Sequence, residues 1–118
     1  MTSFQFQAAS ESTSEDEYGC QFRRILPWDK SGPSDTGMGV STIAPGGTTT
    51  QHSHEDYEQF YVVRGVGIAH VDEEVTPIGP GDAFVVRSNQ THFFTNASET
   101  DELELVSVWS IGPLGGVG

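Results

Sequence analysis

The sequence predicts a small all-β domain, either a sandwich or a barrel. Short runs of β-branched and aromatic residues recur about every ten residues, and turns rich in Gly, Pro and Asp separate them. No stretch shows a helical period of apolar residues. The length of 118 residues suits one domain with its own core, and the chain shows no internal repeat.

Three regions are expected along the chain. Residues 1–21 hold an N-terminal strand and an acidic mobile segment, residues 22–111 form the barrel, and residues 112–118 are a flexible tail. The alternation from Phe4 to Ala8 fits a short edge strand or a plain tail. The acidic stretch from Ser10 to Glu17 is expected to be a mobile loop, because it has little apolar surface to bury.

The strands are expected where β-branched and aromatic residues alternate with others, and where Gly, Pro or Asp ends the run. The strongest is EQFYVVR, residues 58–64. In order, the expected strands are 22–26, 38–44, 58–64, 68–71, 75–78, 83–87, 92–95 and 103–111, with turns at 45–47, 72–74 and 79–82 and a surface loop over 28–37.

The composition argues against several classes of function. Seventeen acidic residues face five basic ones, for a net charge of −12, so the surface repels phosphate backbones and anionic lipid. Cys20 is the only cysteine and can form no internal disulfide. The chain has no secretory signal pattern and no apolar run near the ~18 residues of a membrane span. We expect a cytoplasmic protein without nucleic-acid or membrane partners.

Four residues are the candidates for a metal-binding site. His52 and His54 are two apart, so on an extended chain their imidazoles point to the same side. Glu58 shares their parity, and His92 opens a later strand that a closed sheet can bring across to them. Each residue also has an ordinary explanation on its own. His52 and His54 can be an exposed pair, Glu58 a solvated carboxylate at a strand end, and His92 a packed histidine. The prediction depends on the combination.

Three imidazoles and a carboxylate suit a divalent transition metal. Zn, Fe, Mn and Ni, as well as Co and Cu, accept these ligands, and ligand type does not choose between them. An ion that accepts six ligands would keep positions open for water, substrate or oxygen, whereas zinc can hold four or five.

The glycine frame around these residues resembles a known family, the cupins. Gly46, His52, His54, Glu58 and Gly65 have the spacing of the first conserved cupin motif. Gly81, His92 and Asn96 have the spacing of the second. The resemblance implies a single-domain cupin antiparallel β-barrel (double-stranded β-helix or jelly roll) of six to eight strands, often a homodimer. It also implies that His52, His54, Glu58 and His92 hold a metal ion inside, near one mouth.

Two positions depart from the second motif. Arg87 stands where proline is usual, and Asn89 stands where glycine is frequent. Asparagine tolerates the left-handed backbone conformation, so Asn89 is expected to replace the glycine. Arg87 is expected to extend its charge along the strand or towards the pocket.

Four residues are the candidates for binding substrate: Phe60, Arg87, Phe94 and Asn96. Phe60 shares the parity of Glu58 and should line the cavity, and Phe94 is a core residue or part of the pocket wall. For Asn96, a turn or a hydrogen bond behind the ligands is the favoured alternative. His70 is expected to be structural or exposed.

One arginine of this acidic chain has a further candidate role. Arg23, Arg24 and Arg64 are three of the five basic residues, and one of them can pair with a substrate carboxylate. For any single arginine a surface salt bridge is the simpler interpretation.

We expect a metal-dependent enzyme that acts on a small polar metabolite. The resemblance leaves open an oxygen-dependent dioxygenase, a metal-dependent isomerase or lyase, and a non-catalytic protein that binds a small molecule, since a fold does not determine function. A third class is a role in which the metal only stabilises the barrel.

A narrower resemblance covers the stretch from Arg23 through both motifs to Trp109, which is similar to the cupin module of hydrazine synthetases. Those bacterial natural-product enzymes join two nitrogens by pairing a cupin with a methionyl-tRNA-synthetase-like domain. The resemblance implies a zinc ion here and a separate synthetase-like partner protein.

Overall fold

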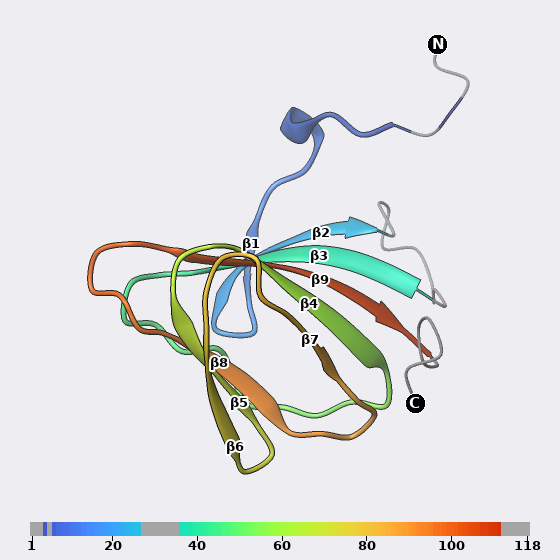
Figure 1. Cartoon of the computed structure of the whole chain (residues 1–118). Coiled ribbons are helices and arrows are strands. Elements are labelled where there is room, and N and C mark those ends of the chain that lie inside the picture. Colours follow the sequence, from blue (N-terminus) through green and yellow to red (C-terminus); the bar gives the residue numbers. More distant parts are fainter. Residues whose placement is uncertain (1–3, 5, 27–35, 112–118) are drawn as a thin grey trace.

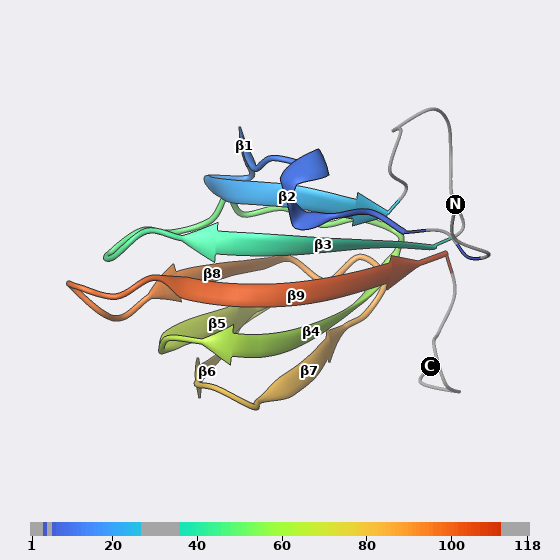
Figure 2. The ribbon, with the colours of Figure 1, turned by 90° about the horizontal axis from the view of Figure 1, so that it is seen from above.

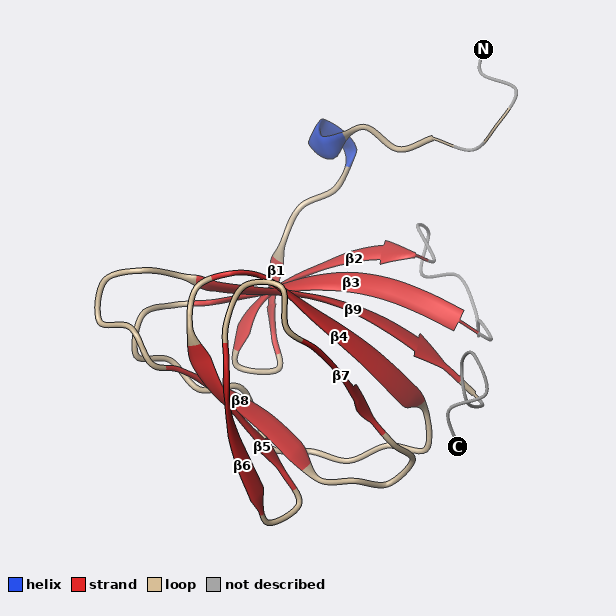
Figure 3. Ribbon diagram, viewed as in Figure 1, coloured by secondary structure: helices blue, strands red, loops and turns tan. Residues whose placement is uncertain are grey.

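The computed structural model describes residue 4, residues 6–26 and residues 36–111. Within these residues the fold is almost entirely β, with one 3-10 turn, η1 (Ala9–Glu11), as its helical element (Figure 3). No helix among them is long and apolar enough to cross a membrane. The strands are β1 (Glu15–Glu17), β2 (Cys20–Leu26), β3 (Thr36–Ile43), β4 (Tyr57–Arg64), β5 (Gly67–Val71), β6 (Glu74–Ile78), β7 (Ala83–Val86), β8 (His92–Asn96) and β9 (Leu103–Ser110).

The strands form two antiparallel sheets. The larger sheet has six strands in the order β1-β2-β3-β9-β4-β7, and the smaller has three in the order β6-β5-β8. In Figure 1 the larger sheet fans out, and β8, β5 and β6 lie opposite it; Figure 2 shows the same strands from above. Apolar side chains from both sheets fill the space between them. The predicted all-β antiparallel fold is confirmed.

The predicted strands are all present, and their ends differ from the prediction by at most two residues. The two-residue differences are at the starts of β2 and β3. Because β3 begins at Thr36, the last residues of the predicted surface loop belong to a strand. The remainder of that loop and the predicted tail, residues 112–118, lie outside the described residues.

The N-terminal region differs from the expectation. Residues 15–17, predicted to be mobile, form β1, which pairs with β2 from Glu15↔Phe22 to Glu17↔Cys20. Tyr18 and Gly19 close this hairpin with φ of 57° and 76°, the pattern of a type I′ turn, whose twist suits two paired strands. Acidic composition did not prevent pairing because β1 is an edge strand whose charges stay exposed or half-buried. The described part of the Phe4–Ala8 run forms no strand.

The register of the larger sheet separates an apolar end from a polar end. At one end Ile43 pairs with Leu103, and both are fully buried. At the other end Trp109 pairs with Gly37 on one side and with Glu58 on the other. Glu58, one of the predicted metal ligands, therefore lies at the end of the sheet away from Ile43 and Leu103.

Candidate metal centre

The three histidines of the predicted site come from two segments that pair across the sheets. His52 lies in the extended segment before β4 and forms an isolated antiparallel bridge with His92, the first residue of β8. The two backbone bonds of this bridge measure 3.2 and 2.9 Å. His54 follows two residues after His52, and its carbonyl accepts a 2.7 Å hydrogen bond from the backbone N–H of Asn89.

Asn89 has the backbone conformation that the sequence predicted. Its φ of 65° is in the left-handed region, which asparagine adopts more readily than most residues. Because its N–H also binds the carbonyl of His54, this turn connects the segment that carries His54 with the one that leads to His92.

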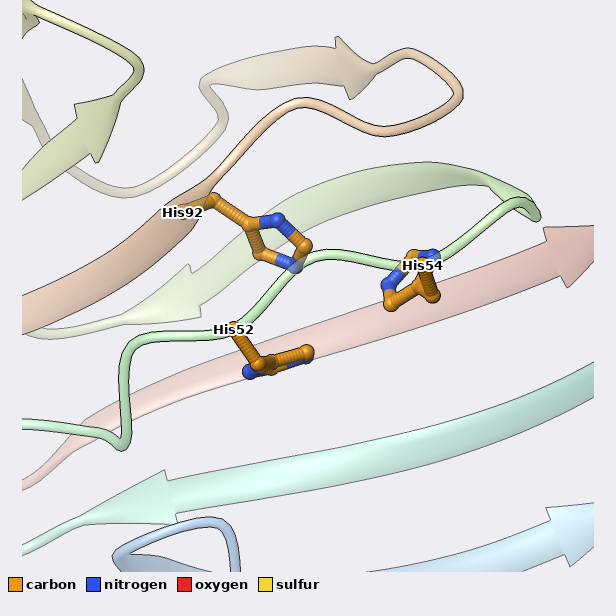
Figure 4. A group of neighbouring side chains, drawn as sticks. All are labelled: His52, His54 and His92. Atoms are coloured by element: carbon orange, nitrogen blue, oxygen red, sulfur yellow. The ribbon is translucent and has the colours of Figure 1, made fainter.

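The imidazole rings gather around one point, as Figure 4 shows. The ring centroids are 4.5 Å apart for His52 and His92, 4.9 Å for His54 and His92, and 5.4 Å for His52 and His54. One ring nitrogen from each histidine lies within 4.8 Å of the other two. The structure therefore brings together three of the four predicted ligands as a group that can hold a metal ion.

Each ring is oriented by a backbone carbonyl at its Nδ1 atom. The Nδ1 atoms of His52, His54 and His92 lie 2.9, 3.0 and 2.9 Å from the carbonyl oxygens of Thr50, Asp56 and Gln90. A carbonyl oxygen can only accept, so each Nδ1 carries the proton. In a neutral ring the lone pair then sits on Nε2, the arrangement that protein metal sites use to fix the tautomer and orientation of a ligand.

His92 supplies the observation that best tests the fit of a metal ion. Its side chain is 1% exposed. Among the described residues, its Nε2 is the buried side-chain nitrogen or oxygen that has no hydrogen-bond partner. Burial, the largest cause, lowers the pKa of His92, so the ring is neutral at pH 7. A buried lone pair without a donor is costly unless something binds it, and the donor set therefore fits a divalent transition-metal ion.

Glu58, the fourth predicted ligand, stands beside the three rings on β4. Its Oε1 is 3.1 Å from Nε2 of His54 and 3.8 Å from Nε2 of His92. The hydrogen bond with Glu58 is the largest cause that raises the pKa of His54. In the metal-free protein this carboxylate therefore favours a proton on His54. Its Oε1 is also close enough to the histidine nitrogens to approach an ion bound by them.

The triad of His52, His54 and His92 lines a cavity of about 400 Å³. Phe60 and Phe94, predicted to bind substrate, are buried and line this cavity, with ring centroids 4.9 Å apart. A cavity of this size, in which apolar rings lie beside polar groups, is typical of a small-molecule site. The lining residues are Tyr18, Cys20, Phe22, Arg24, Ser41, Thr49, His52, His54, Asp56, Glu58, Phe60, His92, Phe94 and Trp109.

Two other predicted substrate-binding residues lie elsewhere. Arg87 is exposed and borders a separate hollow with Glu74 and Gln90. Asn96 is 2% exposed, and its amide donates to the backbone carbonyls of Ile43, Ala44 and Asp101. The structure thus gives Asn96 the supporting role that was the alternative, because its amide groups are already engaged by the loops around it.

Sequence reasoning missed several residues that border the cavity. Tyr18 stacks on His52 with ring centroids 5.7 Å apart, and Trp109 pairs with Glu58 across β9 and β4. Gly19 was the local signal for the turn that places Tyr18, because glycine readily adopts a positive φ. For Trp109 core packing was the default expectation and the pocket wall the alternative, and it lines the cavity. His70 lies outside the triad, stacked on Phe93 at 4.1 Å. Burial raises the pKa of the Cys20 thiol, which argues against a nucleophile there.

The sequence is similar to a known protein family and to two characterised proteins. Residues 39–109 match the family model described as Cupin domain. Protein SchB of Streptomyces halstedii is 29% identical over 97 residues, which is 81% of this chain and 68% of SchB. The oxalate-binding protein of Thermotoga maritima is 33% identical over 67 residues, which is 56% of this chain and 54% of that protein, so this chain matches only about half of that relative.

A solved structure has a similar fold. The cupin 2 conserved barrel domain protein of Salinispora arenicola has a TM-score of 0.77 and 17% sequence identity, over 92% of this chain and 90% of that chain. At this identity the likeness shows the fold alone. The family model, in contrast, covers more than half of the sequence and includes all four predicted metal ligands. The chain therefore belongs to the cupin family.

Proposed function

We propose that this cupin is a metal-dependent enzyme that acts on a small polar metabolite, with one divalent transition-metal ion held by His52, His54, Glu58 and His92. The observation that carries the proposal is the buried, unpartnered Nε2 of His92, directed towards two rings whose Nδ1 atoms are also bound to carbonyls. A structural histidine would satisfy both of its nitrogens.

The roles of the chain's own residues follow from their contacts. Three backbone carbonyls hold the imidazoles in one orientation, and Glu58 can hold or release a proton at Oε1 beside His54. Phe60, Phe94 and Trp109 exclude water from one side of the cavity. When bound, the ion supplies a Lewis acid for a substrate oxygen or nitrogen, or an oxygen-activating centre if it is redox active.

Elemental analysis by mass spectrometry tests the metal site. The protein is purified without chelator or metal-affinity resin, as wild type, His92→Ala and His70→Ala. Wild type and His70→Ala should carry close to one metal ion per chain, and His92→Ala should lose most of it, because His92 belongs to the triad and His70 stacks on Phe93 outside it. Equal metal content in His92→Ala and wild type, or no metal in any of them, would refute the site.

The metal that is found decides the next measurement. Iron would direct the search to oxygen consumption with candidate acids. Zinc would favour Lewis-acid chemistry and justify a search for a synthetase-like partner. N–N bond formation with such a partner stays a prediction from the sequence.

A second candidate function is non-catalytic binding of a small molecule. The observation that favours it is the 33% identity with a protein named for binding oxalate. The two candidates differ in turnover. NMR spectra of the metal-loaded protein with small organic acids would show new product signals for an enzyme, and only line broadening and shifts for a binding protein.

The expected homodimer is also a proposal. On the outer side of β4, Tyr61 and Val63 are 50% and 42% exposed, and apolar patches of this kind favour association. Light scattering at several concentrations would measure the mass, and Tyr61→Lys should shift a dimer towards the monomer.

A further inference from the structure

Arg24 occupies a place in the cavity that the metal proposal does not use. We infer that its guanidinium binds the carboxylate of the ligand, so the substrate class of this site is a small organic acid. This inference rests on the proposed function, because it concerns the same cavity and names what enters it.

The structure separates Arg24 from the other arginines considered in the sequence. Nε of Arg23 donates to the hydroxyl of Ser12 at 2.6 Å. Arg64 is on the surface, 2.9 Å from Glu102 and 3.7 Å from Glu104. Arg24 has the parity of Cys20 and Phe22 on β2, and of the arginines in the described chain it alone lines the cavity with the triad.

Two aromatic rings support the Arg24 guanidinium. Its Cζ lies 5.4 Å from the ring centroid of Phe22 and 5.5 Å from that of Trp109. Both distances are within the range of a cation–π contact, which favours a charged group partly removed from water. The rings leave the edge of the planar guanidinium as its hydrogen-bonding side.

The neighbouring strand β3 has glycines at the two positions that contact these rings. A Cβ atom at Gly37 would overlap the Trp109 ring, and one at Gly39 would overlap the Phe22 ring. Gly39 is also the cross-strand partner of Arg24, and Gly37 that of Trp109. Any larger residue at these positions would displace the rings beneath the guanidinium.

The nearest carboxylate leaves room for a ligand. Oε2 of Glu17 is 3.8 Å from Nη2 of Arg24, which is an ion pair but too long for a hydrogen bond. The two side chains are 23% and 31% exposed. Within the described structure, Glu17 therefore balances the charge of Arg24 without engaging its N–H donors, and a better placed carboxylate can take them.

The surroundings favour a carboxylate over a phosphate. Asp56 and Glu58 line the same cavity, and the whole chain has a net charge of −12. A doubly charged phosphate meets more repulsion here than a singly charged carboxylate. A planar guanidinium also matches a carboxylate with two parallel hydrogen bonds.

The experiment compares acids with their neutral amides. Acetate, oxalate and benzoate are titrated against acetamide, oxamide and benzamide by isothermal calorimetry, using zinc-loaded protein. At least one acid should bind, and Arg24→Gln should weaken it about tenfold or more, the loss expected for a charge-assisted hydrogen bond. Binding of the amides should not change. Arg64→Gln is the matched control and should behave as wild type.

A charge-balanced variant separates contact from general electrostatics. Glu17→Gln combined with Arg24→Gln keeps the net charge of wild type, and the tenfold loss should persist in it. Arg24→Lys keeps the positive charge but lacks the two parallel N–H donors of the guanidinium. Its affinity for acids should lie between those of Arg24→Gln and wild type. Thermal melts of each variant verify that it is folded.

The outcome for Arg24 is distinguishable from the outcome for the metal. Metal content is measured in every variant, and the titrations are repeated on metal-free protein, where the difference between wild type and Arg24→Gln should remain. If wild type carries no metal but this difference is present, only the metal proposal fails. If no acid binds wild type, or Arg24→Gln binds acids as wild type does, the inference about Arg24 is wrong.

Discussion

Glu58 controls the protonation of His54 in the metal-free protein. Its hydrogen bond holds the pKa of His54 above the ordinary value of 6.5. A metal ion needs the neutral ring, so the proton competes as pH falls through this raised pKa, starting above pH 6.5. We expect zinc affinity, measured by chelator competition, to fall between pH 8 and pH 6. His92 takes up its proton at a lower pH than His54, since burial lowers its pKa.

The Glu58→Gln variant should separate the two effects of this carboxylate. Without the charge, the pKa of His54 falls, so the decline in zinc affinity should move to lower pH. Affinity at pH 8 should also drop if Glu58 is a ligand. Glu55→Gln, an exposed carboxylate in the same segment, is the control. An unchanged pH profile in Glu58→Gln would contradict the assigned cause.

Asn96 is expected to matter for stability and not for binding. Its Nδ2 lies 3.0, 3.2 and 2.8 Å from the carbonyl oxygens of Ile43, Ala44 and Asp101, and its Oδ1 accepts from the backbone N–H of Ser98. Asn96→Ala leaves these buried groups without a partner, which should cost about 2–3 kcal/mol of unfolding free energy in urea. Metal content per folded chain should stay as in wild type; a loss of metal without a loss of stability would contradict this role.

Among single residues, the sequence predicted the three clustered histidines and the lining rings of Phe60 and Phe94, but not how the rest of the cavity is assembled. His52 and His54 are related by strand parity, which is a local property, and the two motifs supplied Glu58 and His92. Arg24 and Trp109 meet only through the pairing of β2, β3 and β9, which the sequence does not specify. Arg87 was predicted to bind substrate because of its charge and its position in the second motif, yet it follows the end of β7 and borders another hollow.

Among the secondary-structure elements, the β1–β2 hairpin connects the N-terminal region with the site. The backbone N–H of Thr50 donates to the carbonyl of Tyr18 at 2.8 Å, and the carbonyl of Thr50 in turn holds Nδ1 of His52. Gly19 forms the turn with a φ of 76°, and a Cβ there would lie 3.0 Å from backbone atoms of Thr48 and Thr50. The turn therefore sets the position of the segment that carries His52.

Gly19→Ala should destabilise the protein and disturb this segment. The positive φ alone costs about 1 kcal/mol for a residue with a Cβ, and the contact with Thr48 and Thr50 adds to it. Gly46→Ala is the matched control, because Gly46 has a φ of 71° but nothing within 4 Å of an added Cβ. We expect a larger fall in melting temperature and faster amide exchange at Thr50 for Gly19→Ala. Equal effects in both variants would show that strain alone matters.

Most strands that carry β-branched or aromatic residues were predicted to within one residue. The strand predicted over 58–64 and observed as β4 (Tyr57–Arg64) combines β-branched and aromatic residues and is predicted almost to its ends. β1 was missed because its three residues are all acidic, and only pairing with β2 stabilises them. Local composition thus predicts strands with their own apolar face, and tertiary pairing decides the others.

For the whole molecule, the division between an apolar end and a polar end has an energetic consequence. Ile43, Val62, Leu103 and Leu105 are all 0% exposed and are paired or packed at the end opposite the triad. These residues supply hydrophobic stabilisation that does not depend on the metal site. The barrel should therefore remain folded when the site is empty.

Removal of the metal should lower the melting temperature without unfolding the protein at room temperature. Binding at about 100 times the dissociation constant contributes about 2.7 kcal/mol, which corresponds to a shift of about 10 °C for a domain of this size. Calorimetry with and without EDTA, followed by added zinc, measures the shift and its reversal. His92→Ala should melt at the same temperature under all three conditions, because it lacks the buried ligand. If chelation instead unfolds wild type at 25 °C, the metal holds the barrel together, and the apolar end is not sufficient for the fold.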